Sequence, residues 1–335
     1  MSTPSTLQHI KYSVLDLVPV LQGKSQQQAM HNALSLAQHA ERLGFYRFWI
    51  SEHHNMDSLV SSATVVLLGY IAENTSKIRV GSGGIMLPNH APLVVAEQFG
   101  TLETLYPNRI DLGIGRAPGT DQRTTLALRR DKQESVQDFP NHLIELQQYF
   151  SEDNFSEAVR AIPGEGLDIP MYLLGSSTFS AKLAAQKGWP YAFASHFAPA
   201  QLFNALHIYN NEFQPSAVLQ SPYAFACVNV ILADTDEEAH KLATSLYQLA
   251  MGIITNTRRP LQPPIPTMEG IWNLPQKEMI LSMLQYTFIG SKTTVAKQLE
   301  DFVLQTRVQE LIVVSHIYDL EARKHSYTLL SELFK

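Results

Sequence analysis

The sequence predicts an α/β protein in which eight parallel strands close into a (β/α)8 barrel, the TIM barrel. Short runs of β-branched and aromatic residues alternate with longer amphipathic segments, and the length of 335 residues suits such a barrel. Regular alternation of this kind requires a parallel sheet whose faces are covered by helices. An open, doubly wound sheet is the alternative. We expect residues 1–335 to form a single domain with insertions at the carboxyl ends of the strands.

The predicted strands are apolar runs that are bounded by turn residues. In chain order they are residues 12–17, 47–52, 78–87, 110–115, 171–174, 191–194, 225–232 and 311–316. Amphipathic segments separate most of them. In the first, residues 25–42, the apolar residues Ala29, Ala33, Leu36 and Ala40 recur at helical spacing, and Gly44 is typical of a residue that ends a helix.

Two regions interrupt this alternation. Residues 121–163 are rich in charge and predict helices near 122–130 and 139–150. Residues 255–269 carry four prolines that exclude a regular helix or a central strand, at positions Pro260, Pro263, Pro264 and Pro266. Long segments at strand ends usually serve as lids or binding elements, so we expect both to lie over the site.

Composition limits the partners. The net charge is -6 with both signs interspersed, so a nucleic-acid surface is not expected and a small-molecule substrate is. The first ten residues lack the features of a signal peptide, and no apolar run reaches the length of a membrane span, so we expect no membrane contact and a cytoplasmic location. The one cysteine, Cys227, lies in an apolar run and predicts a buried strand residue.

Polar clusters follow four of the predicted strands. They occupy residues 52–55, 88–90, 113–119 and 175–180, and a barrel would place them on one face. The first cluster contains Glu52, His53 and His54. Because consecutive residues of an extended segment point in opposite directions, these three cannot all bind one metal ion, and we predict no metal site.

The cluster after the fifth strand predicts an anion site. Gly175 allows the backbone to turn, and Ser176, Ser177 and Ser180 place hydroxyl and backbone N–H groups at the start of a helix, where the dipole favours a negative charge. Arg116 could add the bidentate guanidinium that a phosphate prefers. Helix capping by the serines and a solvated arginine are the alternatives.

Glycines within the third strand predict a bulge or the close approach of a flat ligand, since glycine weakens a strand. They flank Ser82 in the run Gly81 to Gly84. FMN, with one phosphate and a tricyclic ring, satisfies this constraint and the anion site together.

Nucleotide-binding motifs are absent: there is no P-loop, and Gly113 and Gly115 are followed by a third glycine at the wrong spacing for a dinucleotide fold.

Four blocks of sequence, FWISEHHN at 48–55, VGSGGIMLP at 80–88, RIDLGIGR at 109–116 and IGSKTTV at 289–295, resemble the bacterial luciferase-like flavin monooxygenases. The resemblance covers nearly the whole chain and is closest to the single-chain, luciferase-like oxidoreductases. It implies a (β/α)8 barrel that binds reduced FMN at its carboxyl face. Ser82 and Gly83 then correspond to the segment that faces the flavin, where relatives have a non-proline cis peptide.

The resemblance also assigns roles to single residues. It implies that Arg116, Ser176, Ser177 and Ser180 bind the phosphate. His53 corresponds to the histidine that assists the flavin chemistry of luciferases. There are two departures from the family pattern: Gly115, a predicted cofactor contact, replaces a reactive cysteine, and Ser176 replaces an acidic residue. Luminescence with a long-chain aldehyde is therefore not expected.

The function predicted from the sequence is an FMN-dependent monooxygenase that uses reduced flavin and O2 to oxygenate a small organic substrate, with the flavin supplied by a separate reductase. His53 is the predicted catalytic residue, because an unperturbed pKa of about 6.5 suits proton transfer in both directions. The alternatives are F420-dependent hydride transfer, non-catalytic flavin binding and a metal-dependent hydrolase. Relatives imply a homodimer through the helix that follows Ser61.

Overall fold

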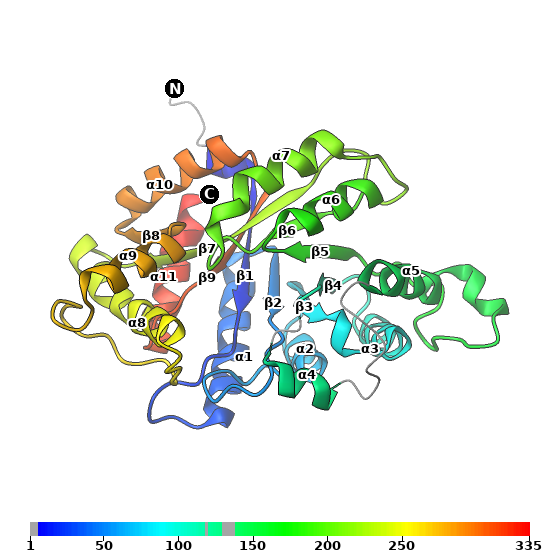
Figure 1. Cartoon of the computed structure of the whole chain (residues 1–335), viewed down its shortest axis with the longest axis horizontal. Coiled ribbons are helices and arrows are strands. Elements are labelled where there is room, and N and C mark those ends of the chain that lie inside the picture. Colours follow the sequence, from blue (N-terminus) through cyan, green and yellow to red (C-terminus); the bar gives the residue numbers. More distant parts are fainter. Residues whose placement is uncertain (1–5, 118–119, 129–137) are drawn as a thin grey trace.

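Eight parallel strands close into a barrel in the computed structural model of this chain, which describes residues 6–117, 120–128 and 138–335 (Figure 1). From β1 to β7 each strand pairs with the next in the chain. β7 then pairs with β9, and β9 pairs with β1 to complete the ring. The strands are β1 Lys11–Asp16, β2 Arg47–Ile50, β3 Arg79–Met86, β4 Ile110–Gly115, β5 Met171–Gly175, β6 Tyr191–Phe193, β7 Ala224–Leu232 and β9 Glu310–Val314. The predicted barrel is confirmed over the open sheet.

A further strand, β8 (Thr287–Gly290), is not predicted by the sequence pattern. It pairs with the second half of β7, from Asn229 to Leu232. β7 has nine residues, whereas β6 has three, so β6 leaves backbone groups of β7 unpaired. Buried backbone groups require partners, and β8 supplies them. It contains only two large apolar residues, Phe288 and Ile289, between Thr287 and Gly290, so it does not stand out as an apolar run.

The helices surround the barrel and follow the strands in the expected alternation (Figure 1). They are α1 Gln26–Leu43, α2 Thr64–Glu73, α3 Pro92–Leu105, α4 Gln122–Leu128, α5 Phe139–Phe150, α6 Thr178–Lys187, α7 Leu202–Glu212, α8 Asp236–Ile254, α9 Leu274–Met283, α10 Lys292–Thr306 and α11 Leu320–Leu333. Short 3₁₀ helices occur at Thr6–His9, Leu87–Asn89, Glu152–Ser156 and Pro199–Gln201. Of the helices described, none is both long and apolar enough to cross a membrane.

The end of α1 illustrates how the sequence sets these boundaries. Ser25 accepts a hydrogen bond from the backbone N–H of Gln28, which satisfies a donor that the first turn leaves free. Gly44 has φ of 87°, a left-handed conformation that glycine adopts without strain, and its N–H bonds to the last turn. Both were expected from the residue types.

The amino-terminal end of the barrel is closed by an ion network. Arg47, at the start of β2, is buried, and its Nη1 lies 2.7 Å from Oδ2 of Asp111 while its Nε lies 2.9 Å from Oε1 of Glu310. Trp49 donates from Nε1 to the same Asp111 oxygen at 3.1 Å. Aromatic side chains, among them Tyr172, pack above this network inside the barrel. Access to the interior is therefore from the carboxyl end.

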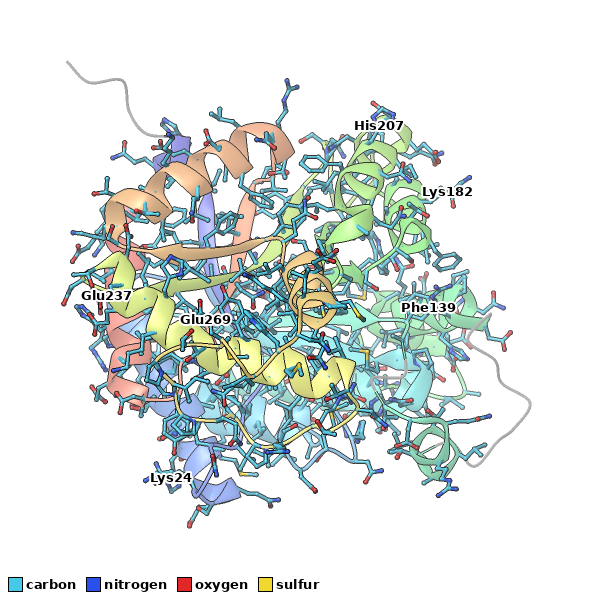
Figure 2. All side chains as sticks on the ribbon, turned by 60° about the vertical axis from the view of Figure 1, so that its left-hand side comes forward. Lys24, Phe139, Lys182, His207, Glu237 and Glu269 are labelled. Atoms are coloured by element: carbon cyan, nitrogen blue, oxygen red, sulfur yellow. The ribbon has the colours of Figure 1, made fainter. Side chains whose placement is uncertain are left out.

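The two insertions lie where the pattern places them. α4 and α5 occupy the first, although residues 129 and 130 of the predicted helix lie outside the described residues. The proline-rich segment has no helix or strand; Leu261 pairs with Leu21 through an isolated bridge, and its N–H donates to the carbonyl of Val20 at 2.7 Å. In Figure 2, α8 and the segment around Glu269 lie in front of the barrel strands. Cys227 is buried in β7, as predicted.

Candidate functional site

The polar loops after β2, β3, β4 and β5 meet at the carboxyl rim of the barrel, as predicted. Thr120 donates from Oγ1 to the carbonyl of His54 at 3.1 Å, which links the loops after β4 and β2. Asn55, in the loop after β2, donates from Nδ2 to Oδ2 of Asp121, in the loop after β4, at 3.1 Å. His90 joins the loop after β3 to Glu52 after β2, and Arg116 joins the end of β4 to Phe179 of α6. The four clusters therefore form one site region.

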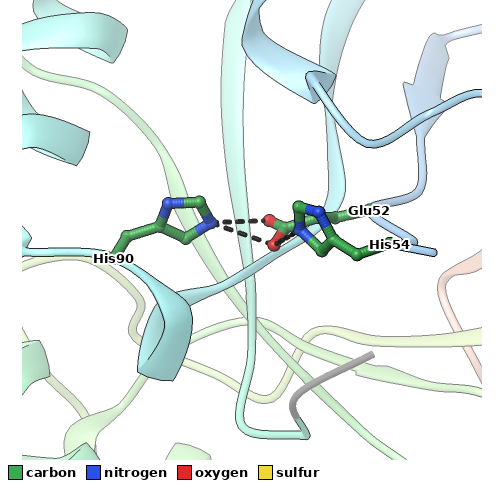
Figure 3. Close-up of side chains that lie close together, drawn as sticks. All are labelled: Glu52, His54 and His90. Carbon is green, nitrogen blue, oxygen red and sulfur yellow. Dashed lines mark hydrogen bonds and ion pairs between the residues drawn. The ribbon is translucent and has the colours of Figure 1, made fainter. Parts of the chain in front are cut away.

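Glu52 holds two imidazoles at this rim (Figure 3). Nε2 of His54 lies 2.8 Å from Oε1, and Nε2 of His90 lies 2.9 Å from Oε1 and 3.0 Å from Oε2. The backbone N–H of Met86 donates to Oε2 at 2.9 Å, and Nδ2 of Asn89 donates to Oε1 at 3.3 Å. The carboxylate thus fixes the end of β2 to the loop after β3.

The charge of Glu52 is stabilised by these donors. Burial alone raises the pKa of Glu52, but the hydrogen bonds from His54 and His90, together with the Met86 N–H, outweigh burial and lower that pKa to about 2. The ligand atoms of Glu52, His54 and His90 lie close enough together to hold a metal ion. The prediction of no metal site rests on Glu52, His53 and His54 and does not include His90; in this structure the imidazoles of His54 and His90 bond to the carboxylate itself.

His53 points away from this cluster, as the alternation along an extended segment predicts. Its Nδ1 lies 3.0 Å from Oγ of Ser51, and its ring lines a cavity. Burial lowers the pKa of His53 to about 4; Arg258 and His54 add to this effect, while Glu52 opposes it. The imidazole is therefore neutral near pH 7, and the expectation that it titrates near neutrality is wrong.

The structure brings Arg116 and the start of α6 together, as the predicted anion site requires. The guanidinium of Arg116, at the end of β4, stacks on the ring of Phe179 in the first turn of α6, 4.0 Å from its centroid. Ser177 is the residue before this helix, and its side chain does not cap it. Among the described residues, the hydroxyls of Ser176, Ser177 and Ser180 have no hydrogen-bond partner. These donors fit a phosphate group.

Gly175 explains why Ser180 lies so close to the strand. A Cβ at position 175 would lie 2.5 Å from Cβ of Ser180, so glycine is required for α6 to start directly above β5. Ser180 itself is buried. The sequence predicts the start of this helix at residue 180, and the structure starts it two residues earlier, at Thr178.

The glycine-rich part of β3 is irregular, as predicted. The register between β3 and β4 shifts between Ser82 and Ile85, and the peptide bond between Gly83 and Gly84 is cis. Ser82 is buried, and its Oγ donates to the carbonyl of Gly113 at 2.8 Å, so this hydroxyl is occupied in joining β3 to β4. A cofactor could therefore bond to the backbone of Ser82 or donate to its Oγ, but could not accept from this hydroxyl.

Gly115, the last residue of β4, faces the end of β3. A Cβ at this position would lie 2.8 Å from Sδ of Met86, so a larger residue here requires that the methionine side chain moves. None of the predicted cofactor-binding residues lines the cavity beside His53. The predicted cofactor residues and the cavity therefore occupy different parts of the rim.

The cavity has a volume of about 270 Å³ and mostly apolar walls. α8 and the end of α9 contribute Leu246, Leu249 and Met283, while His53, His196 and His316 follow β2, β6 and β9. Arg258 and Leu261, from the proline-rich segment, complete it.

His196 and His316 receive no role from the sequence, although both follow predicted strand ends. Burial lowers the pKa of His196 to about 3, with His316 and His53 adding to the effect. Burial also lowers the pKa of His316 to about 4; Arg323 acts in the same direction and Asp16 opposes it. A titratable residue at the end of a barrel strand is the signal that could have identified them. Arg258 has no such signal.

The fold gathers polar loops at the carboxyl rim of a barrel, which is where enzymes of this architecture have their active sites. The chain belongs to the luciferase-like monooxygenase family, whose model matches residues 10–309. It is 47% identical to a luciferase-like monooxygenase of Escherichia coli strain K12, over 97% of each chain. It is 32% identical to the N-acetyl-S-alkylcysteine monooxygenase of Bacillus subtilis strain 168, over 96% of this chain and 98% of that one. The predicted family is therefore confirmed.

Solved structures support the same assignment. Apo-MsnO8 superposes with a TM-score of 0.91 at 36% identity, covering 97% of this chain and 98% of that chain. More distant structures share the fold alone. They include the oxygenating component of a diketocamphane monooxygenase of Pseudomonas putida in complex with FMN, at 17% identity and a TM-score of 0.73, and an F420-dependent secondary alcohol dehydrogenase, at 14% and 0.71.

Proposed function

We propose that this protein is an FMN-dependent monooxygenase that uses reduced FMN and O2 to oxygenate a small organic substrate, and that a separate reductase supplies the flavin. The observation that carries the choice of cofactor is the stack of Arg116 on Phe179 at the uncapped start of α6. A guanidinium and a free helix N-terminus together favour a phosphate dianion.

The residues at the rim suit this cofactor. Arg116, Ser176, Ser177 and Ser180 would hold the phosphate, and the irregular part of β3, at Gly83, would face the ring. When bound, reduced flavin supplies the electrons that reduce O2. The apolar cavity beside His53 would exclude bulk water from the reacting groups.

The role proposed for His53 changes with its pKa. As a neutral imidazole it can accept a proton or a hydrogen bond at Nε2, which has no protein partner among the described residues. Ser51 fixes the ring through Nδ1. We therefore propose that His53 acts as a base or hydrogen-bond acceptor and that it does not carry a positive charge near pH 7.

Titration with FMN, riboflavin and F420 tests the cofactor. We expect FMN to bind more tightly than riboflavin, because riboflavin lacks the phosphate. Tighter binding of F420 than of FMN would favour hydride transfer without oxygen. Oxygen consumption by the reduced complex, screened against organic substrates, then tests the reaction. FMN binding with no turnover of any substrate would favour a non-catalytic flavin protein.

A relative suggests where to begin the substrate screen. Because an N-acetyl-S-alkylcysteine monooxygenase is 32% identical over nearly the whole chain, we propose that compounds of that kind be tested first.

We also propose a homodimer and a cytoplasmic location. The exposed side chains of Val66 and Tyr70 on α2 and Val94 on α3 support the dimer. Light scattering of the purified protein would test it.

A further inference from the structure

The cavity beside His53 has one fixed charge on its wall. Of the described residues that line it, Arg258 alone carries a permanent charge, and no carboxylate is present. The remaining wall is largely apolar, with Leu246, Leu249 and Leu284 among its residues. A cavity with this distribution attracts an anion to one end and an apolar group to the rest.

Arg258 has no anionic partner. Its guanidinium makes one contact within the described part of the chain, from Nη1 to Sδ of Met56 at 3.9 Å, and thioether sulfur is a weak acceptor. Arg258 also lies in a segment that Leu261 ties to the loop after β1. Arg258 is exposed, so its guanidinium lies at the edge of the cavity, where water and not a protein anion meets its donors.

Two imidazoles in the same wall also lack partners. His196 and His316 are 8% and 6% exposed, and neither ring makes a hydrogen bond to any described residue. A buried polar group without a partner is costly, and most such groups in native proteins are paired. The fully buried nitrogen of each ring is Nδ1, which a ligand in the cavity does not reach. Since both rings line the cavity, a bound ligand with polar groups would meet the accessible Nε2 of each ring.

We propose that this cavity is the substrate site and that it takes a compact carboxylic acid, with the carboxylate on Arg258 and an apolar body between α8 and α9. The volume of about 270 Å³ corresponds to about nine water molecules, and so to a ligand of about ten non-hydrogen atoms. Arg258 is thus a specificity-determining residue. The inference deepens the proposed function, because it names the class of molecule that is oxygenated.

Calorimetric titration without flavin tests the binding step separately from catalysis. The ligands are hexanoate, octanoate and phenylacetate, each compared with its neutral amide. We expect the wild-type protein to bind at least one acid about tenfold more tightly than its amide, the effect of one hydrogen bond to a charged group. Arg258→Gln should remove this preference and leave the affinity for the amide within about twofold.

The chain provides a matched control in the adjacent residue. Arg259 is also exposed but lines a separate hollow with Gln248 and Gln262. Arg259→Gln should leave the preference for the acid intact. Ile253→Trp narrows the cavity from its exposed edge. It should lower the affinity for the acid and for the amide together. If the ligand binds at the surface near Arg258 instead, both affinities stay unchanged.

Three results would overturn the inference: no saturable binding of any acid by the wild-type protein, equal affinity for acid and amide, or the same loss in both arginine variants. Thermal unfolding of each variant shows whether it is folded. Because no flavin is present, failure of FMN to bind would contradict the proposed function and leave these titrations interpretable.

Discussion

Loss of stability in mild acid is the most quantitative prediction that the cavity allows. His196 and His316 are buried, and burial holds the pKa of His196 at about 3 and that of His316 at about 4, below the ordinary value near 6.5. Between pH 6.5 and 4 the unfolded chain therefore binds protons that the folded protein does not. Since stability rises with pH wherever the unfolded state binds more protons, stability falls as the pH is lowered through this window.

The size of the effect follows from the linkage relation. Each histidine whose folded pKa stays well below 5 lowers the free energy of unfolding by about 2 kcal/mol between about pH 7.5 and pH 5, so the two together lower it by about 4 kcal/mol. A loss of this size is a large part of the 5–15 kcal/mol typical of a folded protein.

Urea unfolding, followed by circular dichroism at about pH 7.5, 6 and 5, measures this loss. His196→Phe and His316→Leu should each reduce the difference between pH 7.5 and 5 by about 2 kcal/mol, because each removes one titrating group. His207→Gln is the control, since His207 is exposed on α7 (Figure 2). If both cavity variants lose as much stability in acid as the wild-type protein, the imidazoles are not held neutral by the fold and the reasoning fails.

Three further predictions concern the cofactor, the chemistry and the barrel interior. Arg116→Ala should weaken FMN binding by about 1.5–3 kcal/mol and leave riboflavin nearly unaffected; equal losses in a fluorescence titration would refute a phosphate contact. His53→Ala should keep FMN affinity within about threefold while oxygenation falls by about 10²–10⁴-fold in stopped-flow measurements; wild-type rates would make the imidazole structural. Arg47→Met should reduce the free energy of unfolding by about 3–5 kcal/mol in urea, because Glu310 then stays buried without a cationic partner, while Asp111 keeps only Arg79. A loss below about 1 kcal/mol would show that water reaches these carboxylates.

Local patterns predict the barrel well because most of its strands are largely buried apolar runs. β4 and β7 are buried at every residue, and such runs are recognisable in the sequence alone. The irregularity of β3 is also local, since the glycines themselves cause it. β8 is not predicted because it forms by pairing with the second half of β7, and that half is left unpaired only once the sheet has assembled.

The candidate site is predictable only where its residues follow strand ends in a recognisable block. Arg116, directly after β4, lies against Phe179 in the first turn of α6, the helix that Ser177 precedes. His90 lies in one of the predicted polar clusters, but its contact with Glu52 depends on tertiary structure, as does the contact of Arg258 with Met56. The neutral state of His53 could not be predicted either, because its pKa depends on burial.

The acid sensitivity and the proposed substrate binding arise from one feature, the burial of imidazoles that lack partners. A sequence selected for stability alone would place apolar side chains at positions 196 and 316, since an unpaired buried polar group costs about 1–3 kcal/mol. Such costs concentrate at sites that bind ligands, where the missing partner arrives with the ligand. Arg258 is the charged residue of the same cavity: it is exposed at the edge, and no protein anion among the described residues pairs with its guanidinium. The three side chains come from different parts of the chain and converge on one apolar space, so a small acid bound there would meet the guanidinium and the accessible Nε2 atoms of the two imidazoles together.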